Sequence, residues 1–179
     1  VVALRSLGDT AGEREALKKW TAFDDEASDG FLRLMELATA EKDWPTVART
    51  AEKYLGVNPL VPAPYRYSAQ ASTELGDLPT ATLALQTLLQ LDVPEAPEIH
   101  FKLAQLLHKR GQQQEAQRHV LSALEETPRY REALRLLVDI KRARAEPAPI
   151  SPAPTAPSTP HTVTPPAESK PVIEGAEKI

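Results

Sequence analysis

The sequence predicts an all-α protein: an α-solenoid of antiparallel helix hairpins, followed by a disordered, proline-rich C-terminal tail. Ala and Leu dominate residues 1–146, whereas aromatic residues make up only 5% of the chain. A short turn motif recurs at a spacing of 34 residues, and the composition changes sharply after Glu146. Helices packed through small and aliphatic side chains fit this composition, whereas the sustained apolar–polar alternation typical of strands is missing.

The turn motif appears most clearly in two segments, Lys42-Asp43-Trp44-Pro45 and Gly76-Asp77-Leu78-Pro79. Proline suits the first turn of a helix because its missing N–H would have no partner there. The preceding aspartate suits the helix N-cap and the positive end of the helix dipole. Each segment therefore predicts a tight turn into the second helix of a hairpin.

A third copy of the motif follows after 35 residues, at Gly111. We assign the extra residue to the loop 92–97, where a solenoid tolerates an insertion. This register predicts full repeats over 28–61, 62–96 and 97–130. Their first helices are expected over 30–42, 64–75 and 97–110, and their second helices over 45–57, 79–91 and 113–126. In the third repeat the apolar residues recur at helical spacing: Phe101, Leu103, Ala104, Leu106, Leu107, Ala116, Val120, Leu121, Ala123 and Leu124.

The two ends of the array are expected to be incomplete or capped. Residues 1–27 contain the same turn at Leu7-Gly8-Asp9, and we interpret them as a truncated repeat comprising the end of a first helix and a second helix. The chain starts within this helix pattern at Val1, so we expect it to be part of a longer protein. Residues 131–146 predict a capping helix with a strongly charged outer face, as the open end of a solenoid requires.

The segment 147–179 has the composition of a disordered tail. Nine of its 33 residues are proline, mixed with Ala, Ser and Thr. Such a segment buries too little apolar surface to offset the entropy lost on ordering. We interpret it as a spacer, with docking of its PxxP spacings on an aromatic groove as the alternative.

The repeats resemble the tetratricopeptide repeat family. In the third repeat Leu103, Ala104, Gly111, Ala116 and Pro128 fall at the family's characteristic positions, whereas the first repeat lacks the turn glycine. The resemblance implies a right-handed superhelix whose concave groove binds a peptide or protein partner. The residues expected to face that groove are Arg66, Gln70, Thr73 and Glu74 in the second repeat and Glu98, Phe101, Gln105, His108 and Lys109 in the third. The asparagines of the family's chaperone-binding clamp are absent, so we do not expect a chaperone C-terminus as the ligand.

No motif predicts an enzyme within this segment, and we expect neither a cofactor nor a metal. The chain has no cysteine, no HExxH pair and no glycine-rich phosphate loop. His100 and His108 are about two turns apart on one predicted helix and His119 is on the next, so they are not placed to share a metal. We interpret His100 as a partly buried contact within the hairpin and His108 as a residue of the groove surface. No apolar run approaches the roughly 18–20 residues of a membrane span. A net charge of −4 argues against non-specific nucleic-acid binding.

Two functional hypotheses follow. The first is a scaffold for protein–protein interaction that holds a partner segment in the groove. The second is a non-catalytic docking or structural appendage of an upstream enzyme, because the final helix and proline-rich end resemble the C-terminal repeat arrays of some large bacterial proteins. In some of those, a zinc-peptidase-like domain lies upstream. We expect the compartment, cytoplasmic or exported, to follow from the region before Val1. An RNA-binding helical repeat is a third, less favoured interpretation.

Overall fold

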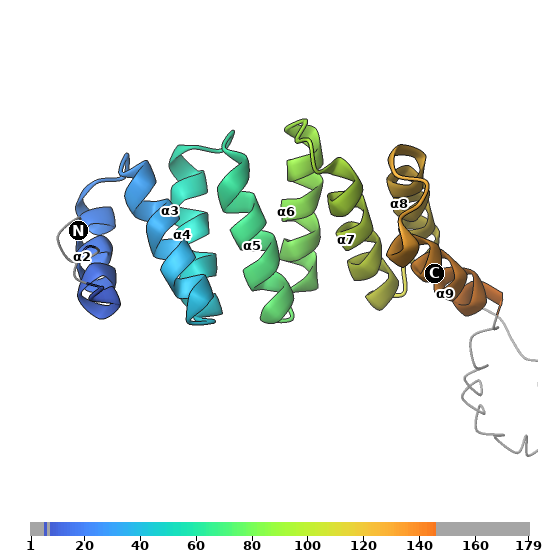
Figure 1. The fold of residues 1–179 in the computed structure, drawn as a ribbon, viewed down its shortest axis with the longest axis horizontal. Helices are drawn as coiled ribbons and strands as arrows, with labels where there is room; N and C mark the ends of the chain where they lie inside the picture. The colour runs from blue at the N-terminus through green and yellow to red at the C-terminus, as the bar shows by residue number, and fades with distance from the viewer. Residues whose placement is uncertain (1–5, 7, 146–179) are drawn as a thin grey trace, which may run out of the picture. The chain divides into compact units, whose positions relative to one another are not determined.

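The structure is a computed structural model, and it describes residue 6 and residues 8–145. Helices follow one another in a row (Figure 1), and the described residues contain no strand. The helices are α2 (Thr10–Phe23), α3 (Ser28–Ala40), α4 (Trp44–Val57), α5 (Pro62–Glu74), α6 (Leu78–Gln90), α7 (Ala96–Lys109), α8 (Gln113–Glu126) and α9 (Arg131–Ala145). The predicted spacer, residues 147–179, lies outside the described residues.

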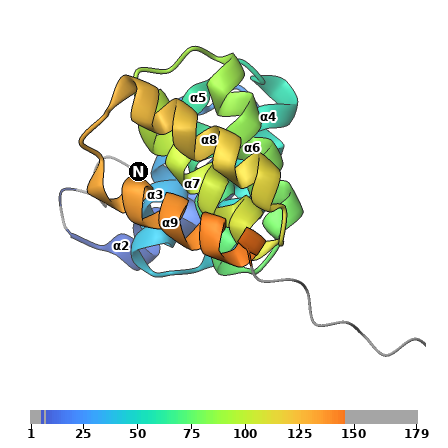
Figure 2. The ribbon, with the colours of Figure 1, turned by 90° about the vertical axis from the view of Figure 1, so that its right-hand side faces the viewer.

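The predicted helices form, each within the one or two residues by which helix ends ordinarily vary. Consecutive helices pack against each other from α2 to α9, and the three hairpins are α3–α4, α5–α6 and α7–α8. In addition α3 contacts α5, and α7 contacts α9. In the view along the row, the helices lie one behind another and overlap (Figure 2).

Aspartate side chains cap the second helices α2, α4 and α6, as the repeated motif predicts, whereas α8 begins after Gln112, whose side chain makes no capping hydrogen bond. Asp9 accepts a hydrogen bond from the Gly12 N–H at 2.9 Å, at the start of α2. Asp43 and Asp77 accept the equivalent bonds from the N–H groups of Thr46 and Thr80, both at 3.2 Å. These bonds satisfy amide groups that have no partner within the helix.

The residue before the N-cap of each of the helices α2, α4, α6 and α8 has a left-handed backbone. Gly8, Gly76 and Gly111 have φ angles of 73°, 78° and 77°. Lys42 stands at the same position of the first full repeat and adopts a φ of 58° despite its side chain. The turn therefore forms without glycine, at the steric cost that a β-carbon carries in this conformation.

We expect Lys42→Gly to raise the free energy of unfolding by about 1 kcal/mol, because glycine has no β-carbon to strain the left-handed turn. Urea denaturation of the full chain measures the change. The matched variant Gly76→Ala should lower stability by a similar amount. An added β-carbon at Gly76 meets no heavy atom within 4 Å, so only the backbone effect remains. Equal stabilities of both variants and the wild type would contradict this explanation.

The largest hydrophobic cluster joins α5 to α9. Leu103, Leu107, Val120 and Ile140 are fully buried within it. Alanines at the helix crossings bring the backbones close together: Ala81, Ala104, Ala116 and Ala133 are each 0% exposed. The core thus uses the apolar positions of the predicted repeats, and the third repeat lies at its centre.

The first repeat has a smaller core of its own. Phe31 on α3 and Tyr54 on α4 are buried, and their ring centroids are 5.5 Å apart in a tilted arrangement. Lys53 lies over the Phe31 ring at 5.5 Å. Aromatic contacts of this kind add to the hydrophobic burial that joins α3 to α4.

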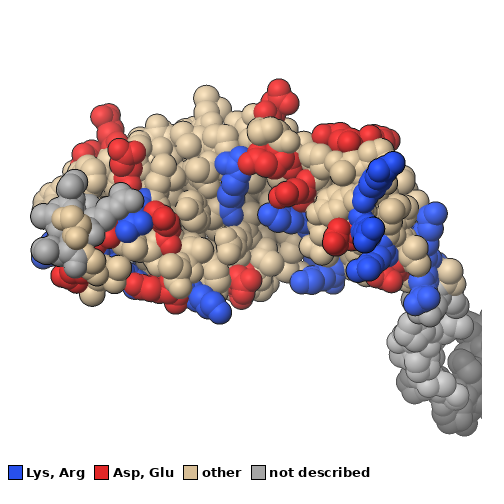
Figure 3. All heavy atoms as spheres, in the orientation of Figure 1, with Lys and Arg blue, Asp and Glu red and all other residues tan. Residues whose placement is uncertain are grey.

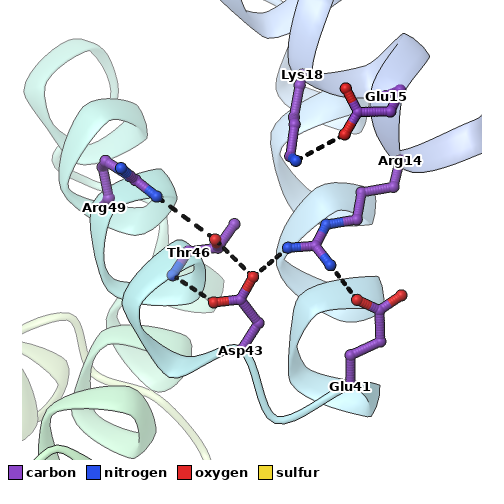
Figure 4. Close-up of polar contacts among 7 residues, drawn as sticks. All are labelled: Arg14, Glu15, Lys18, Glu41, Asp43, Thr46 and Arg49. Atoms are coloured by element: carbon purple, nitrogen blue, oxygen red, sulfur yellow. Dashed lines mark hydrogen bonds and ion pairs between the residues drawn. The ribbon is translucent and has the colours of Figure 1, made fainter. Parts of the chain in front are cut away.

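Charged side chains tie α2 to the first full repeat. Arg14 on α2 forms ion pairs with Glu41 and Asp43 in the turn between α3 and α4 (Figure 4). The Thr46 hydroxyl donates to Asp43 at 2.8 Å. The Thr46 hydroxyl above all, and also Arg14, hold the pKa of Asp43 below its usual range. Asp43 therefore both caps α4 and anchors α2.

At the other end, α9 buries Ala133 and Ile140 against the preceding hairpin. Its outer face is charged, as predicted, with Arg131, Arg135 and Arg142 exposed. Leu134 and Val138 are also exposed there, at 44% and 57%. This face is therefore less polar than the sequence pattern indicated, and the capping role of 131–146 stays a prediction.

Candidate binding groove

The first helices are not evenly spaced along the array. Among the described residues, α3 contacts α5 and α7 contacts α9, but no Cα of α5 lies within 8 Å of a Cα of α7. The loop that leads into α7 holds five residues, 91–95, whereas the loops 24–27, 58–61 and 127–130 hold four. The loop with the expected extra residue therefore lies between α5 and α7, the two neighbouring first helices that do not contact each other.

A cavity of about 580 Å³ occupies this interval. Its floor is apolar and consists of Ala69, Leu85, Leu88, Ile99 and Leu106, each no more than 5% exposed. Polar side chains of α5 and α7 form its two walls. The cavity is therefore a groove between two first helices, closed behind by the second helix α6.

One end of the groove is bridged by an ion pair. Arg66 on α5 donates from one nitrogen to both oxygens of Glu95, at 2.7 and 3.0 Å. A hydrogen bond from its own backbone N–H, and then the Arg66 guanidinium, lower the pKa of Glu95. Both side chains are about two-fifths exposed, so water screens the pair and it adds little to stability.

The remaining polar side chains of the walls are available to a ligand. Among the described residues, none of these has a hydrogen-bond or ion-pair partner: Gln70 and Glu74 on α5, and Glu98, Lys102, Gln105 and Lys109 on α7. On α7 these four residues form one stripe at helical spacing. Figure 3 shows acidic and basic side chains close together over the middle of the array, so the groove surface has mixed charge.

Most of the residues predicted to face a groove line this one cavity. Seven of the nine are in its lining: Arg66, Gln70, Thr73, Glu74, Glu98, Gln105 and Lys109. Phe101 instead packs on Tyr130, with ring centroids 4.9 Å apart. His108 lies at the end of α7, where its Nδ1 is 2.5 Å from Oε1 of Gln113. The structure therefore groups seven of these residues and places Phe101 and His108 beside other elements.

No protein-family model matches the sequence, and no curated protein matches it either. Solved structures do resemble it. MamA superposes with a TM-score of 0.71 at 17% identity, over 80% of this chain and 78% of that one. The first tetratricopeptide-repeat domain of Spaghetti (RPAP3), solved with an HSP90 peptide, gives 0.61 at 16% identity, over 69% and 97%. YrrB, described as having an unusual peptide-binding site, gives 0.60 at 14% identity, over 74% and 71%.

The fold is that of a tetratricopeptide-repeat array. The sequence resemblance is confirmed at the level of the fold, since identities this low establish nothing finer. Within the tetratricopeptide-repeat array, the groove lies between the first helices of the second and third predicted repeats.

Two polar residues of the groove were missed by the sequence interpretation. Lys102 completes the stripe from Glu98 to Gln105 and Lys109, so helical spacing along α7 was a signal that could have found it. Glu95 precedes α7, in the loop with the inserted residue, and no periodicity indicates its position. Its role follows only from the contact with Arg66.

The described residues show neither a cluster of metal ligands nor a membrane-spanning helix. They contain no group of three or more His, Cys, Asp or Glu side chains placed to hold a metal ion. Within the same part of the chain, no helix has both the length and the apolar character that crossing a membrane needs.

Proposed function

We propose that this tetratricopeptide-repeat array is an interaction scaffold that binds an extended peptide or protein segment in the groove between α5 and α7. The observation that carries the proposal is the cavity of about 580 Å³, with an apolar floor between two walls of polar side chains. Concave sites of this size, with apolar lining and a few polar groups, are typical of binding sites.

The wall residues suggest how a peptide is held. Gln70 and Gln105 belong to opposite walls, and each side-chain amide offers both a donor and an acceptor. An extended peptide presents N–H and C=O groups along both edges, and these have no partner within an extended segment. The two glutamines are therefore suited to hydrogen bonds with the main chain of the ligand, which need no particular ligand sequence.

The charges and the floor add selectivity. Lys102 and Lys109 attract carboxylates, whereas Glu74 and Glu98 disfavour a ligand that is acidic throughout. The floor of leucine, isoleucine and alanine accepts aliphatic side chains. We therefore expect a ligand of mixed charge with an aliphatic residue near its centre. Two proteins of the same fold support the class of ligand, since one was solved with a peptide and one is described as having a peptide-binding site.

The test is to select ligands for the full chain from a display library of short random peptides and to measure their affinities by calorimetry. We expect the double variant Gln70→Ala/Gln105→Ala to weaken the selected peptides by about tenfold or more, since each lost hydrogen bond contributes about 1 kcal/mol. The matched control is Gln86→Ala/Gln114→Ala, which removes two exposed glutamines of α6 and α8. Equal losses in the two double variants would reject the groove as the binding site.

A second pair of variants tests the charges. Lys102→Glu should weaken binding of peptides that carry a carboxylate, and most strongly at low salt. Arg118→Glu makes the same charge change on the exposed face of α8 and should leave binding unchanged. The predicted residues Phe101 and His108 are tested separately. A loss of affinity in Phe101→Ala/His108→Ala would show that the ligand continues toward α9.

A further inference from the structure

Two histidines of the third hairpin face each other directly. His100 on α7 and His119 on α8 bring their Nδ1 atoms to 3.0 Å, the distance of a hydrogen bond. Their ring centroids are 5.2 Å apart and their planes differ by 29°. If each Nδ1 lies on the line between the two ring centroids, the centroid distance equals the distance between the nitrogens plus one ring radius for each ring. The observed centroid distance is close to this sum. The rings therefore meet edge to edge, with the two Nδ1 atoms pointing at each other.

This geometry requires one proton between the two nitrogens. A neutral imidazole carries a proton on one nitrogen and a lone pair on the other, so one ring donates from Nδ1 and the other accepts. A first additional proton can bind at the outer nitrogen of the donor ring without breaking the bond. A second would give both rings an N–H at Nδ1, and two like charges and two donors would then meet at 3.0 Å.

The surroundings disfavour the charged rings as well. Burial is the main cause that lowers the pKa of both His100 and His119, and the neighbouring His100 lowers that of His119 further. Glu126 and Glu125 act in the opposite direction on His100, and Glu115 does so on His119. These three carboxylates all belong to α8, and burial outweighs them at both rings.

We propose that the His100–His119 pair is a proton-sensitive joint that holds α7 on α8 near neutral pH and loosens this hairpin in mild acid. Loosening this hairpin would also affect the groove, because α7 carries one of its walls. Among the described residues, no third His, Cys, Asp or Glu side chain joins the two imidazoles in a group that could hold a metal ion.

The sign of the effect follows from the two pKa values. Both are lower in the folded chain than in the unfolded chain, so the unfolded chain binds more protons in acid. The full contribution of the two histidines to the free energy of unfolding is present above the ordinary imidazole pKa of about 6.5. It is lost as the pH falls below that value. Carboxylates titrate mainly below about pH 5. A change in stability between about pH 6.5 and pH 5 therefore comes mainly from histidines.

The experiment compares the melting temperature of the full chain at about pH 7.5 and pH 5.5. We expect the wild type to lose about 5 °C, as a change of roughly one kcal/mol implies. His100→Gln/His119→Gln keeps side-chain hydrogen bonding without titration and should lose much less. The control His108→Gln removes a histidine outside the pair and should behave as the wild type does. An equal loss in all three proteins would overturn the proposal.

A measurement on the wild type keeps the test independent of any variant's folding. Histidine ring signals followed by NMR across the same pH range report the titration of each imidazole. We expect His100 and His119 to titrate below about pH 6.5, and jointly, since strongly interacting groups share their titration steps. Independent titration of both rings at the ordinary value would overturn the proposal. Neither measurement needs a bound ligand, so the result does not depend on the function proposed for the groove.

Discussion

Replacing Leu103 by alanine is expected to lower the free energy of unfolding by about 2–5 kcal/mol. Leu103 lies on α7, is 0% exposed and belongs to the cluster that joins α5 to α9. Truncation removes buried apolar surface and leaves a cavity, because the neighbouring helices collapse only in part. Urea denaturation of the full chain, followed by circular dichroism, measures the effect.

The matched control for this prediction is Leu83→Ala on α6, where the same atoms are lost from a side chain that is 64% exposed. We expect this control to change stability by no more than about 0.5 kcal/mol. Because each repeat contacts only its neighbours, the loss at Leu103 should be concentrated in the third hairpin and α9. Hydrogen exchange should therefore accelerate more on α7–α9 than on α3 and α4. A uniform acceleration would contradict the view that the repeats are coupled only locally.

Helices and turns were predictable from the sequence because their determinants are local. The aspartate caps, the prolines in the first turns and the glycines of left-handed turns lie within a few residues of the helix ends that they determine. Even without a turn glycine, the two helices expected in the first repeat form close to their predicted positions. Lys42 adopts the required left-handed conformation, since the neighbouring signals outweigh its steric cost.

The groove was predictable only in part, because its width depends on how neighbouring repeats are placed. The residue inserted in the loop 92–97 was visible in the sequence, but the separation of α5 and α7 is a property of the packed helices. For the same reason Phe101 could not be assigned to Tyr130 beforehand. Family-like positions describe an average repeat, whereas the packing of α7 against the loop before α9 decides that Phe101 meets Tyr130.

Contacts between side chains of different helices were the least predictable feature. The sequence showed that His100 and His108 are far apart along one helix, and it placed His119 on the next. Which of them meet depends on the rotation of α7 against α8, and the structure pairs His100 with His119. The ion pair between the buried Glu13 and the partly exposed Arg33 is of the same kind, since nothing in the spacing of these two residues indicates their contact.

Arg33→Ala is therefore an informative second test, and we expect it to lower the free energy of unfolding by about 3–5 kcal/mol. Glu13 on α2 has a side chain only 1% exposed, and Arg33 on α3 donates to both of its oxygens at 2.9 Å. Glu13, and to a lesser extent Glu36, raise the pKa of Arg33, so the guanidinium stays charged. Without it, the Glu13 carboxylate loses two charge-assisted hydrogen bonds at a position that is almost closed to solvent in the wild type.

The double variant Glu13→Leu/Arg33→Met distinguishes the loss of the ion pair from the loss of side-chain packing. Both residues then become apolar at similar volume, so no charge is stranded, and stability should return to within about 1 kcal/mol of the wild type or exceed it. Lys18→Ala breaks the exposed pair with Glu15, 2.7 Å apart (Figure 4), and should lower stability far less than Arg33→Ala does. If Arg33→Ala costs no more than Lys18→Ala, water reaches Glu13 readily in the variant. The attachment of α2 to the array would then rest on Leu17 and on the contacts of Arg14 rather than on this pair.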